Sequence, residues 1–126
     1  MSIRAEKAVE YKHNQNNCAQ AVLLAFSDEL GKDEAELKAL GSGFGMGMGC
    51  LEGTCGALCA AGMVLGLLNK QAMPTKMLMK TVLQEFKAQA GATICGDLKG
   101  MNNAGKALCD CDDCIRHAVV ALEKQL

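Results

Sequence analysis

The chain has 126 residues, eight of them cysteine, and its 13 Lys plus Arg against 14 Asp plus Glu give a formal net charge of −1. The near-neutral charge and the 3% aromatic content argue against a nucleic-acid-binding protein, and no basic cluster indicates a membrane-surface anchor. A chain of this length is typical of one domain whose core forms without a metal or a disulfide. We therefore expect a single domain, residues 1–126, whose chemistry is that of its cysteines.

The first ten residues carry four charges and no apolar run, unlike a secretory signal. The longest stretch without charge, residues 53–69, has 17 residues, and a membrane-spanning helix needs about 20 apolar residues. We therefore expect a cytoplasmic protein without membrane insertion. Because cytosolic reductants keep thiols reduced, its cysteines indicate redox cycling or metal binding rather than permanent disulfides.

Helix signals recur along the chain and strand signals are weak. The expected helices cover residues 3–12, 18–30, 34–40, 55–69, 75–90 and 112–126. Their expected N-terminal caps include Ser2, Asn16 or Asn17, Asp33 and Thr54. Gly31 and Gly91 follow the second and fifth helices, where glycine commonly ends a helix. The sequence predicts an all-α bundle of five or six helices in a single domain.

The third helix is followed by GSGFGMGMG, residues 41–49, with five glycines in nine residues. Such a segment favours neither helix nor strand, because each glycine adds ordering entropy and offers no side chain to pack. A phosphate-binding loop is not expected, because no strand precedes the segment and no basic residue lies between Leu40 and Lys70. We expect a tight backbone turn that brings Cys50 beside Cys55 and directs main-chain N–H groups toward sulfur.

The segment from Cys55 to Asn69 is apolar throughout and predicts a fully buried central helix, into which the glycine-rich loop leads. Gly62 and Gly66 are four residues apart and so share one face of this helix. A face without side chains would allow another backbone to approach closely.

Several cysteines fall at expected helix N-termini, namely Cys18, Cys55, and Cys111 or Cys114. The unpaired N–H groups and the helix dipole carry partial positive charge there, which stabilises a thiolate and makes it a better nucleophile and metal ligand. The adjacent carboxylates of Asp110, Asp112 and Asp113 oppose this effect near the last helix. We therefore expect the C-terminal cysteines to suit metal ligation or a resolving role better than the role of most reactive thiol.

The segment CDCDDC, residues 109–114, contains two further patterns. Cys111 and Cys114 have the C-x-x-C spacing of thioredoxin-like proteins, but no βαβ pattern surrounds them. Cys111, Cys114 and His117 could present three zinc ligands on one side of a helix, with Cys109 as a fourth. The ordinary interpretation of His117 is a surface or hydrogen-bonded helix residue.

An ordered set of motifs resembles a known family. The motifs are NCAQAV at 17–22, GFGMGMGC at 43–50, CGA at 55–57 followed by MVLG at 63–66, the isolated Cys95, and Cys114. Together they resemble the redox-active protein family named for its CGAxxG motif (C_GCAxxG_C_C), over residues 10 to about 120. The resemblance implies a small cytoplasmic redox protein with four characteristic cysteines, which are here Cys18, Cys55, Cys95 and Cys114.

The chain departs from the family motif at Ala60, where the family has glycine, and at the additional Cys59. Cys50 and Cys59 are candidate cofactor-binding residues because they lie beside the motif. Cys59, Cys109 and Cys111 lie outside the four, so they are either extra ligands or buried small residues.

Three hypotheses follow for the function. The first is a thiol redox protein, an oxidoreductase if it is an enzyme, in which Cys55 or Cys18 attacks and another of the four family cysteines resolves the mixed disulfide. The second is an iron–sulfur or zinc protein in which those four cysteines are the ligands. The third is a helical interaction protein with inert, buried cysteines. We rank the redox function first and expect a redox partner protein, leaving open its identity and whether the chain forms a homo-oligomer.

Overall fold

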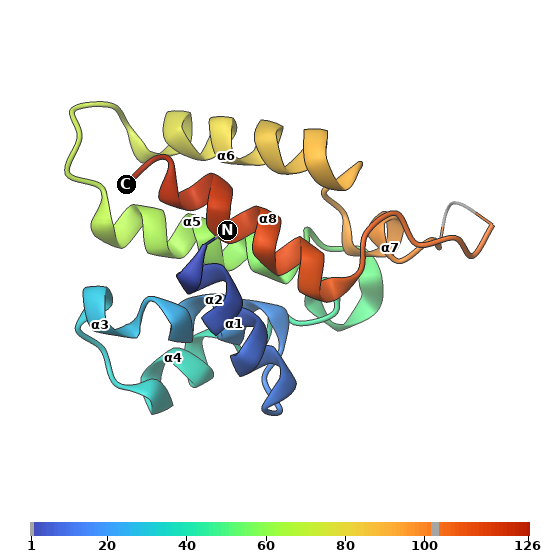
Figure 1. Ribbon diagram of the computed structural model, residues 1–126, viewed down its shortest axis with the longest axis horizontal. Coiled ribbons are helices and arrows are strands. Elements are labelled where there is room, and N and C mark those ends of the chain that lie inside the picture. The colour runs from blue at the N-terminus through green and yellow to red at the C-terminus, as the bar shows by residue number, and fades with distance from the viewer. Residues whose placement is uncertain (1, 102–103) are drawn as a thin grey trace.

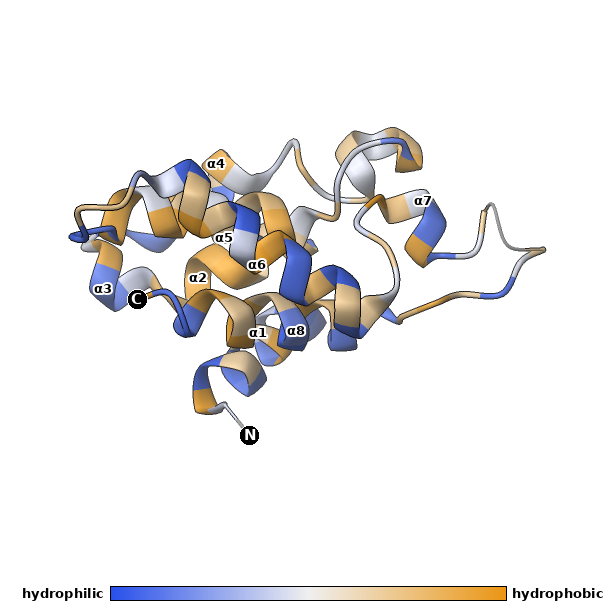
Figure 2. Cartoon of the chain, turned by 90° about the horizontal axis from the view of Figure 1, so that it is seen from above, coloured by the Kyte–Doolittle hydropathy of each residue, from blue (hydrophilic) through white to orange (hydrophobic). Residues whose placement is uncertain are grey.

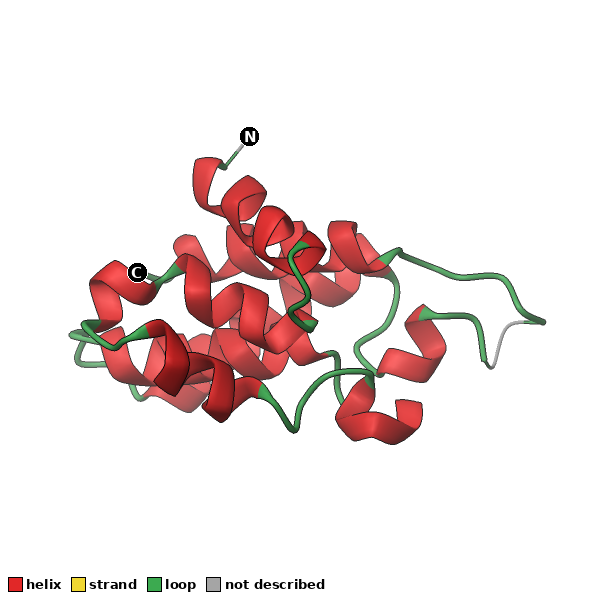
Figure 3. Ribbon diagram, turned by 90° about the horizontal axis from the view of Figure 1, so that it is seen from below, coloured by secondary structure: helices red, strands yellow, loops and turns green. Residues whose placement is uncertain are grey.

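The computed structural model describes residues 2–101 and 104–126. The helical segments are α1 (Ile3–His13), α2 (Cys18–Ala25), α3 (Ser27–Leu30), α4 (Glu34–Gly41), the π-helical turn η1 (Gly47–Leu51), α5 (Gly56–Leu68), α6 (Thr75–Ala90), α7 (Cys95–Leu98) and α8 (Cys111–Glu123). No strand forms within the described ranges, as Figure 3 shows, and the one isolated bridge joins Thr54 to Ile94. The predicted all-α fold is confirmed, and the six segments of eight residues or more match the expected five or six helices.

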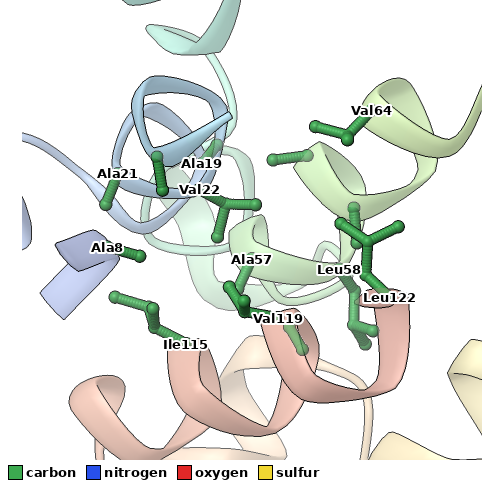
Figure 4. Packing of buried hydrophobic residues seen from close by; sticks show 14 of the residues in the cluster. Ala8, Ala19, Ala21, Val22, Ala57, Leu58, Val64, Ile115, Val119 and Leu122 are labelled. Atoms are coloured by element: carbon green, nitrogen blue, oxygen red, sulfur yellow. The ribbon is translucent and has the colours of Figure 1, made fainter. Parts of the chain in front are cut away.

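The helices stack in layers, with α6 on one side, α5 and α8 in the middle, and α1, α2 and α4 on the other side (Figure 1). Their shared core brings together Ala8 of α1, Val22 of α2, Leu58 of α5, and Ile115 of α8 (Figure 4). Apolar residues run along α2 and α5, whereas polar and apolar residues alternate along α8 (Figure 2). This pattern is expected when α2 and α5 are inner helices and α8 buries one face.

Several helix ends predicted from capping residues in the sequence are confirmed. The Ser2 hydroxyl accepts the N–H of Ala5 at 3.0 Å and caps α1, which extends one residue past the expected Lys12. Asn17 and Gln20 form a reciprocal capping box at the start of α2. The helix from 75 to 90 has the predicted bounds.

Other helix ends differ from the prediction. The expected helix from 18 to 30 is interrupted at Phe26 (φ −106°, ψ 12°), so that α2 ends at Ala25 and the short α3 follows. The N-cap of α5 is Cys55 rather than Thr54. A sulfur lies at the N-terminus of the central helix in either case, and as the N-cap it stands one position earlier than expected.

The central helix α5 is not fully buried, contrary to the prediction, because its last turn is exposed and Leu67 retains 54% of its accessible surface. The expected close backbone approach at Gly62 and Gly66 is also wrong. Their nearest neighbours are the side chains of Met79, at 3.7 Å from a Cβ built on Gly62, and Thr75, at 4.0 Å from one on Gly66. Within residues 2–101 and 104–126, no helix has the length and apolar character that crossing a membrane requires.

Candidate functional site

Four helices begin at or next to a cysteine. Cys18, Cys95 and Cys111 are the first residues of α2, α7 and α8, and Cys55 is the N-cap of α5. These four cysteines and Cys114, in the first turn of α8, line one cavity of about 340 Å³. The cavity therefore lies where helix N-termini from distant parts of the chain meet, and such ends leave backbone N–H groups unpaired.

The glycine-rich segment 41–49 packs tightly against these helix starts. A Cβ on Gly56, the first residue of α5, would lie 2.7 Å from the carbonyl oxygen of Phe44. Gly47 has φ +59°, and a Cβ there would lie 2.7 Å from Cβ of Cys95. Only glycine allows both contacts, so the segment has the expected role of a close backbone turn.

Main-chain hydrogen bonds join the starts of α5 and α7. The N–H of Cys55 donates to the carbonyl of Thr93 at 2.8 Å, and the N–H of Cys95 donates to the carbonyl of Gly53 at 2.9 Å. The isolated antiparallel bridge noted above lies between these bonds. Cys55 and Cys95 are therefore held beside each other by the backbone, independently of their side chains.

Cys18 and Cys111 form what we call the outer pair. Both residues are half-buried, and their thiols are hydrogen-bonded to each other. The hydrogen bond from Cys18 is the main reason that the pKa of Cys111 is lowered to about 6; burial opposes the shift, and the ammonium groups of Lys99 and Lys12 add to it. The same hydrogen bond, followed by burial, raises the pKa of Cys18. At neutral pH, Cys111 is the thiolate and Cys18 the donating thiol.

Cys55 and Cys114 form the inner pair, with exposed fractions of 5% and 3%. The hydrogen bond from Cys114 is the main cause that lowers the pKa of Cys55 to about 7. Burial opposes the shift, and the backbone N–H groups of Ala57 and Leu58 at the start of α5 favour the thiolate. The hydrogen bond to Cys55 and burial both raise the pKa of Cys114.

Two more cysteines adjoin the pairs. Cys95 lines the cavity, and burial raises its pKa. The Cys114 thiol, whose one proton also serves Cys55, donates to the Cys109 carbonyl oxygen at 3.9 Å. Burial raises the pKa of Cys109 as well. Both residues are thiols at neutral pH.

Comparison with known families now bears on this site. The model of the family described as "Putative redox-active protein (C_GCAxxG_C_C)" matches residues 16–125. The chain belongs to this family. A comparison with the curated proteins finds no match, and neither does one with the solved structures. The resemblance inferred from the cysteine motifs is confirmed.

The four cysteines that characterise the C_GCAxxG_C_C family, Cys18, Cys55, Cys95 and Cys114, all line the cavity. The structure thus brings together the residues that the resemblance selected. Their roles as catalytic residues or metal ligands remain predictions.

The two candidate cofactor-binding residues, Cys50 and Cys59, are not among the residues that line the cavity. Cys50 is exposed on η1, and its thiol contacts the carbonyl of Gly47 at 3.6 Å. Cys59 is half-buried on α5, and its thiol contacts the carbonyl of Thr54 at 3.8 Å. The glycine-rich turn thus presents Cys50 to solvent rather than to the cavity, and its expected place beside Cys55 and its cofactor-binding role stay predictions.

The metal hypotheses gain no support from the geometry. In the part of the chain that the structure describes, no three His, Cys, Asp or Glu side chains are grouped so that they could hold one metal ion. This applies to the four cysteines of the C_GCAxxG_C_C family and to the alternative set of Cys109, Cys111, Cys114 and His117. His117 is half-buried on α8 and is not among the residues that line the cavity.

Cys111 is more acidic than its sequence neighbours indicate. The aspartates near the start of α8 predict a disfavoured thiolate, yet the pKa of Cys111 is lowered. Those carboxylates are engaged elsewhere, since Asp112 contacts His13 at 2.8 Å and Asp113 contacts Arg116 at 2.8 Å. The C-x-x-C spacing was the signal that could have placed Cys111 in the site. Nothing in the sequence indicated Lys12 and Lys99, which fold to the cavity from distant segments.

Proposed function

We propose that this member of a redox-active family acts by thiol–disulfide exchange, with the outer and inner pairs each cycling between dithiol and disulfide. The observation that supports this most strongly is that each pair joins a thiolate of lowered pKa to a hydrogen-bonded thiol at one cavity. In such exchange a thiolate attacks a disulfide and a second thiol resolves the mixed disulfide. Each pair would form its disulfide when the two sulfurs approach to the S–S bond length of about 2.05 Å.

The reaction at the outer pair balances as follows. The Cys111 thiolate attacks one sulfur of a substrate disulfide, breaks its S–S bond and releases one substrate thiolate. The sulfur of Cys18 then attacks Sγ of Cys111, forms the internal disulfide and releases the second substrate thiolate, while the proton of Cys18 passes to a released thiolate. The substrate gains two electrons and the outer pair loses two. A thiol reductant reverses the reaction.

The state of the cysteines supports such a cycle. All eight cysteines carry free thiols in this structure, which is the form that can donate electrons. We infer a cytoplasmic location from the cysteine content, because reductants there keep thiols available for redox cycling.

The test is disulfide mapping. The reduced protein would be treated with a mild disulfide oxidant without oxygen, and its cysteine linkages mapped by mass spectrometry before and after addition of a reductant. We expect disulfides Cys18–Cys111 and Cys55–Cys114, both reversible. Cys111→Ser should lose the outer disulfide and keep the inner one, and the matched control Cys50→Ser should keep both because Cys50 is exposed outside the cavity.

Two outcomes would overturn the proposal. Thiols that stay unreactive in the folded protein but react after denaturation would favour the interaction-protein hypothesis. Stoichiometric metal, or visible absorbance from an iron–sulfur cluster after purification without oxygen, would favour the metal hypothesis.

A further inference from the structure

The cavity at the cysteine pairs is positively charged at its rim. Lys12 in the last turn of α1 and Lys99 directly after α7 are among its lining residues, and no Asp or Glu is among them. Within residues 2–101 and 104–126, no ion pair joins either lysine to a carboxylate, unlike Lys124, which pairs with Glu85. Both lysines act instead on the cysteines, and Lys99 is hydrogen-bonded to Cys111. The two ammonium groups therefore face the Cys111 thiolate, and no carboxylate lines the cavity beside them.

The size of the cavity limits what can enter. Its volume of about 340 Å³ lies at the lower end of the roughly 300–1,000 Å³ range of small-molecule pockets. Three of its cysteines have exposed fractions of 7% or less: Cys55, Cys95 and Cys114. A folded protein surface could not bring a disulfide to these three sulfurs, so only a small molecule that enters the cavity would reach them as well as the half-buried Cys111.

The remaining lining is suited to such a molecule. Gln15 lines the cavity with an amide side chain, and Leu98 and Met46 contribute apolar surface. The amides of Asn16 and Asn17, also in the lining, are hydrogen-bonded to the backbone. A few polar groups in a partly apolar pocket are typical of small-molecule sites. The polar groups fix orientation, and the apolar surface would accept the methylene groups that flank a disulfide.

We propose that the substrate of this site is a small disulfide that carries carboxylates, held by Lys12 and Lys99 and attacked by Sγ of Cys111. This inference rests on the proposed thiol–disulfide function and adds the substrate class. The carboxylates take no part in the bond changes, which are those given above: the substrate disulfide is reduced to two thiols and the outer pair is oxidised to a disulfide.

The experiment compares three small disulfides that differ in charge. They are dithiodipropionate, a dicarboxylate; hydroxyethyl disulfide, which is uncharged; and cystamine, a dication. The reduced full-length protein would be mixed with each at low ionic strength, and the rate of thiol loss divided by the rate for free mercaptoethanol under the same conditions. This ratio removes the intrinsic reactivity of each disulfide. We expect the dicarboxylate to exceed the dication by about tenfold or more, since electrostatic attraction commonly changes rates by that factor, and added salt should reduce the difference.

Variants separate the role of the lysines from a general charge effect. The double variant Lys12→Gln, Lys99→Gln should remove most of the preference for the dicarboxylate over the dication. The control Lys80→Gln, Lys87→Gln changes the net charge equally at exposed positions on α6 and should keep the preference. Because any change in the pKa of Cys111 affects all three disulfides alike, the ratio between substrates reports binding charge alone.

The outcomes distinguish this inference from the proposed function. If all three disulfides oxidise the outer pair with the same ratio to mercaptoethanol, and both double variants behave alike, the charge-based substrate class is wrong and the thiol function stands. If none of the three oxidises the folded protein while the denatured chain reacts, the proposed function fails as well.

Discussion

The outer and inner cysteine pairs differ in what surrounds the thiolate. Cys111 is half-buried and lies near the ammonium groups of Lys12 and Lys99, whereas Cys55 is 5% exposed and its thiolate accepts backbone N–H groups at the start of α5. The first environment depends on mobile, solvent-screened side chains, and the second on a rigid main chain. One cavity thus stabilises two thiolates by different means, and the charge of Cys111 also raises the pKa of Cys55 to a lesser extent.

In both pairs a thiol, Cys18 or Cys114, donates a hydrogen bond to the thiolate. Removing this donor should have the largest effect on the pKa of the thiolate. Cys18→Ala should raise the pKa of Cys111, and Cys114→Ala that of Cys55, each toward the ordinary value of about 8.5. The other pair should keep its pKa in each case. The measurement is the pH dependence of alkylation of each cysteine, resolved by mass spectrometry.

Serine variants serve as the control, because a hydroxyl can still donate. Cys18→Ser and Cys114→Ser should each recover part of the lowering that the alanine variant loses. Midpoints that do not move in the alanine variants would show that the donors do not set these pKa values. Alkylation rates at a single pH cannot replace the full titration. A thiolate of higher pKa is less populated but more nucleophilic, so the two effects partly cancel in the rate.

A substitution at Gly56, next to Cys55, should have the next largest effect and should act on the inner pair alone. Gly56→Ala would place a Cβ 2.7 Å from the carbonyl oxygen of Phe44, so the start of α5 must shift. We expect a loss of about 1–3 kcal/mol in the free energy of unfolding and a raised pKa of Cys55, both measured by denaturant unfolding and cysteine titration. Gly43→Ala is the matched control, because no atom lies within 4 Å of a Cβ there, and it should leave stability unchanged or raise it by about 0.4–1 kcal/mol. Equal behaviour of the two variants would contradict the packing argument.

The pH dependence of stability follows from the directions of the shifts. The folded pKa values of Cys111 and Cys55 are lowered to about 6 and about 7, so their stabilisation is fully present above the unfolded value of about 8.5 and is lost as pH falls toward 6. The pKa values of Cys18 and Cys114 are raised, so their stabilisation is present below about pH 8.5 and is lost at higher pH. The reduced protein should therefore be most stable near pH 8.5, on the order of 2 kcal/mol above its value at pH 6.

Denaturant unfolding at a series of pH values checks this. The double variant Cys55→Ser, Cys111→Ser should flatten the acidic side of the curve. It should also weaken the alkaline decline, because Cys18 and Cys114 lose the thiolate partners that are the main cause of their raised pKa values. A wild-type curve that falls steadily from pH 6 upward would contradict the assignment of the two thiolates.

The sequence predicted those features that depend on neighbouring residues. The caps at Ser2 and Asn17 and the bounds of the helix from 75 to 90 follow from side chains that bond or break the adjacent turn. The family resemblance also selected cysteines that prove to line one cavity, although spacing alone gave no reason for Cys95 to approach Cys55. That approach depends on the backbone bonds between residues 53–55 and 93–95, which no local pattern indicates.

The parts that failed depend on contacts between distant segments. Phe26 interrupts a helix that its local sequence would continue, and η1 turns Cys50 outward although Cys50 lies close to Cys55 in the sequence. The charge near Cys111 is the clearest case. The neighbouring aspartates are visible in the sequence, but their partners and the approach of Lys99 appear only in the folded chain.

Two variants with small expected effects on the pKa of Cys111 test how the aspartates and Lys99 contribute to it. Asp112→Asn should hardly change the pKa of Cys111, because the Asp112 carboxylate contacts His13 at 2.8 Å and does not contribute to the shift. Lys99→Gln should raise the pKa of Cys111 by less than about one unit, since an exposed charge is screened by solvent, and should leave Cys55 unchanged because no lysine contributes to its shift. When the alkylation titration is repeated at high salt, most of the difference in the pKa of Cys111 between Lys99→Gln and the wild type should disappear. A larger change from Asp112→Asn than from Lys99→Gln would mean that the sequence-based expectation about the aspartates was correct, and that the outer thiolate does not depend on the lysines.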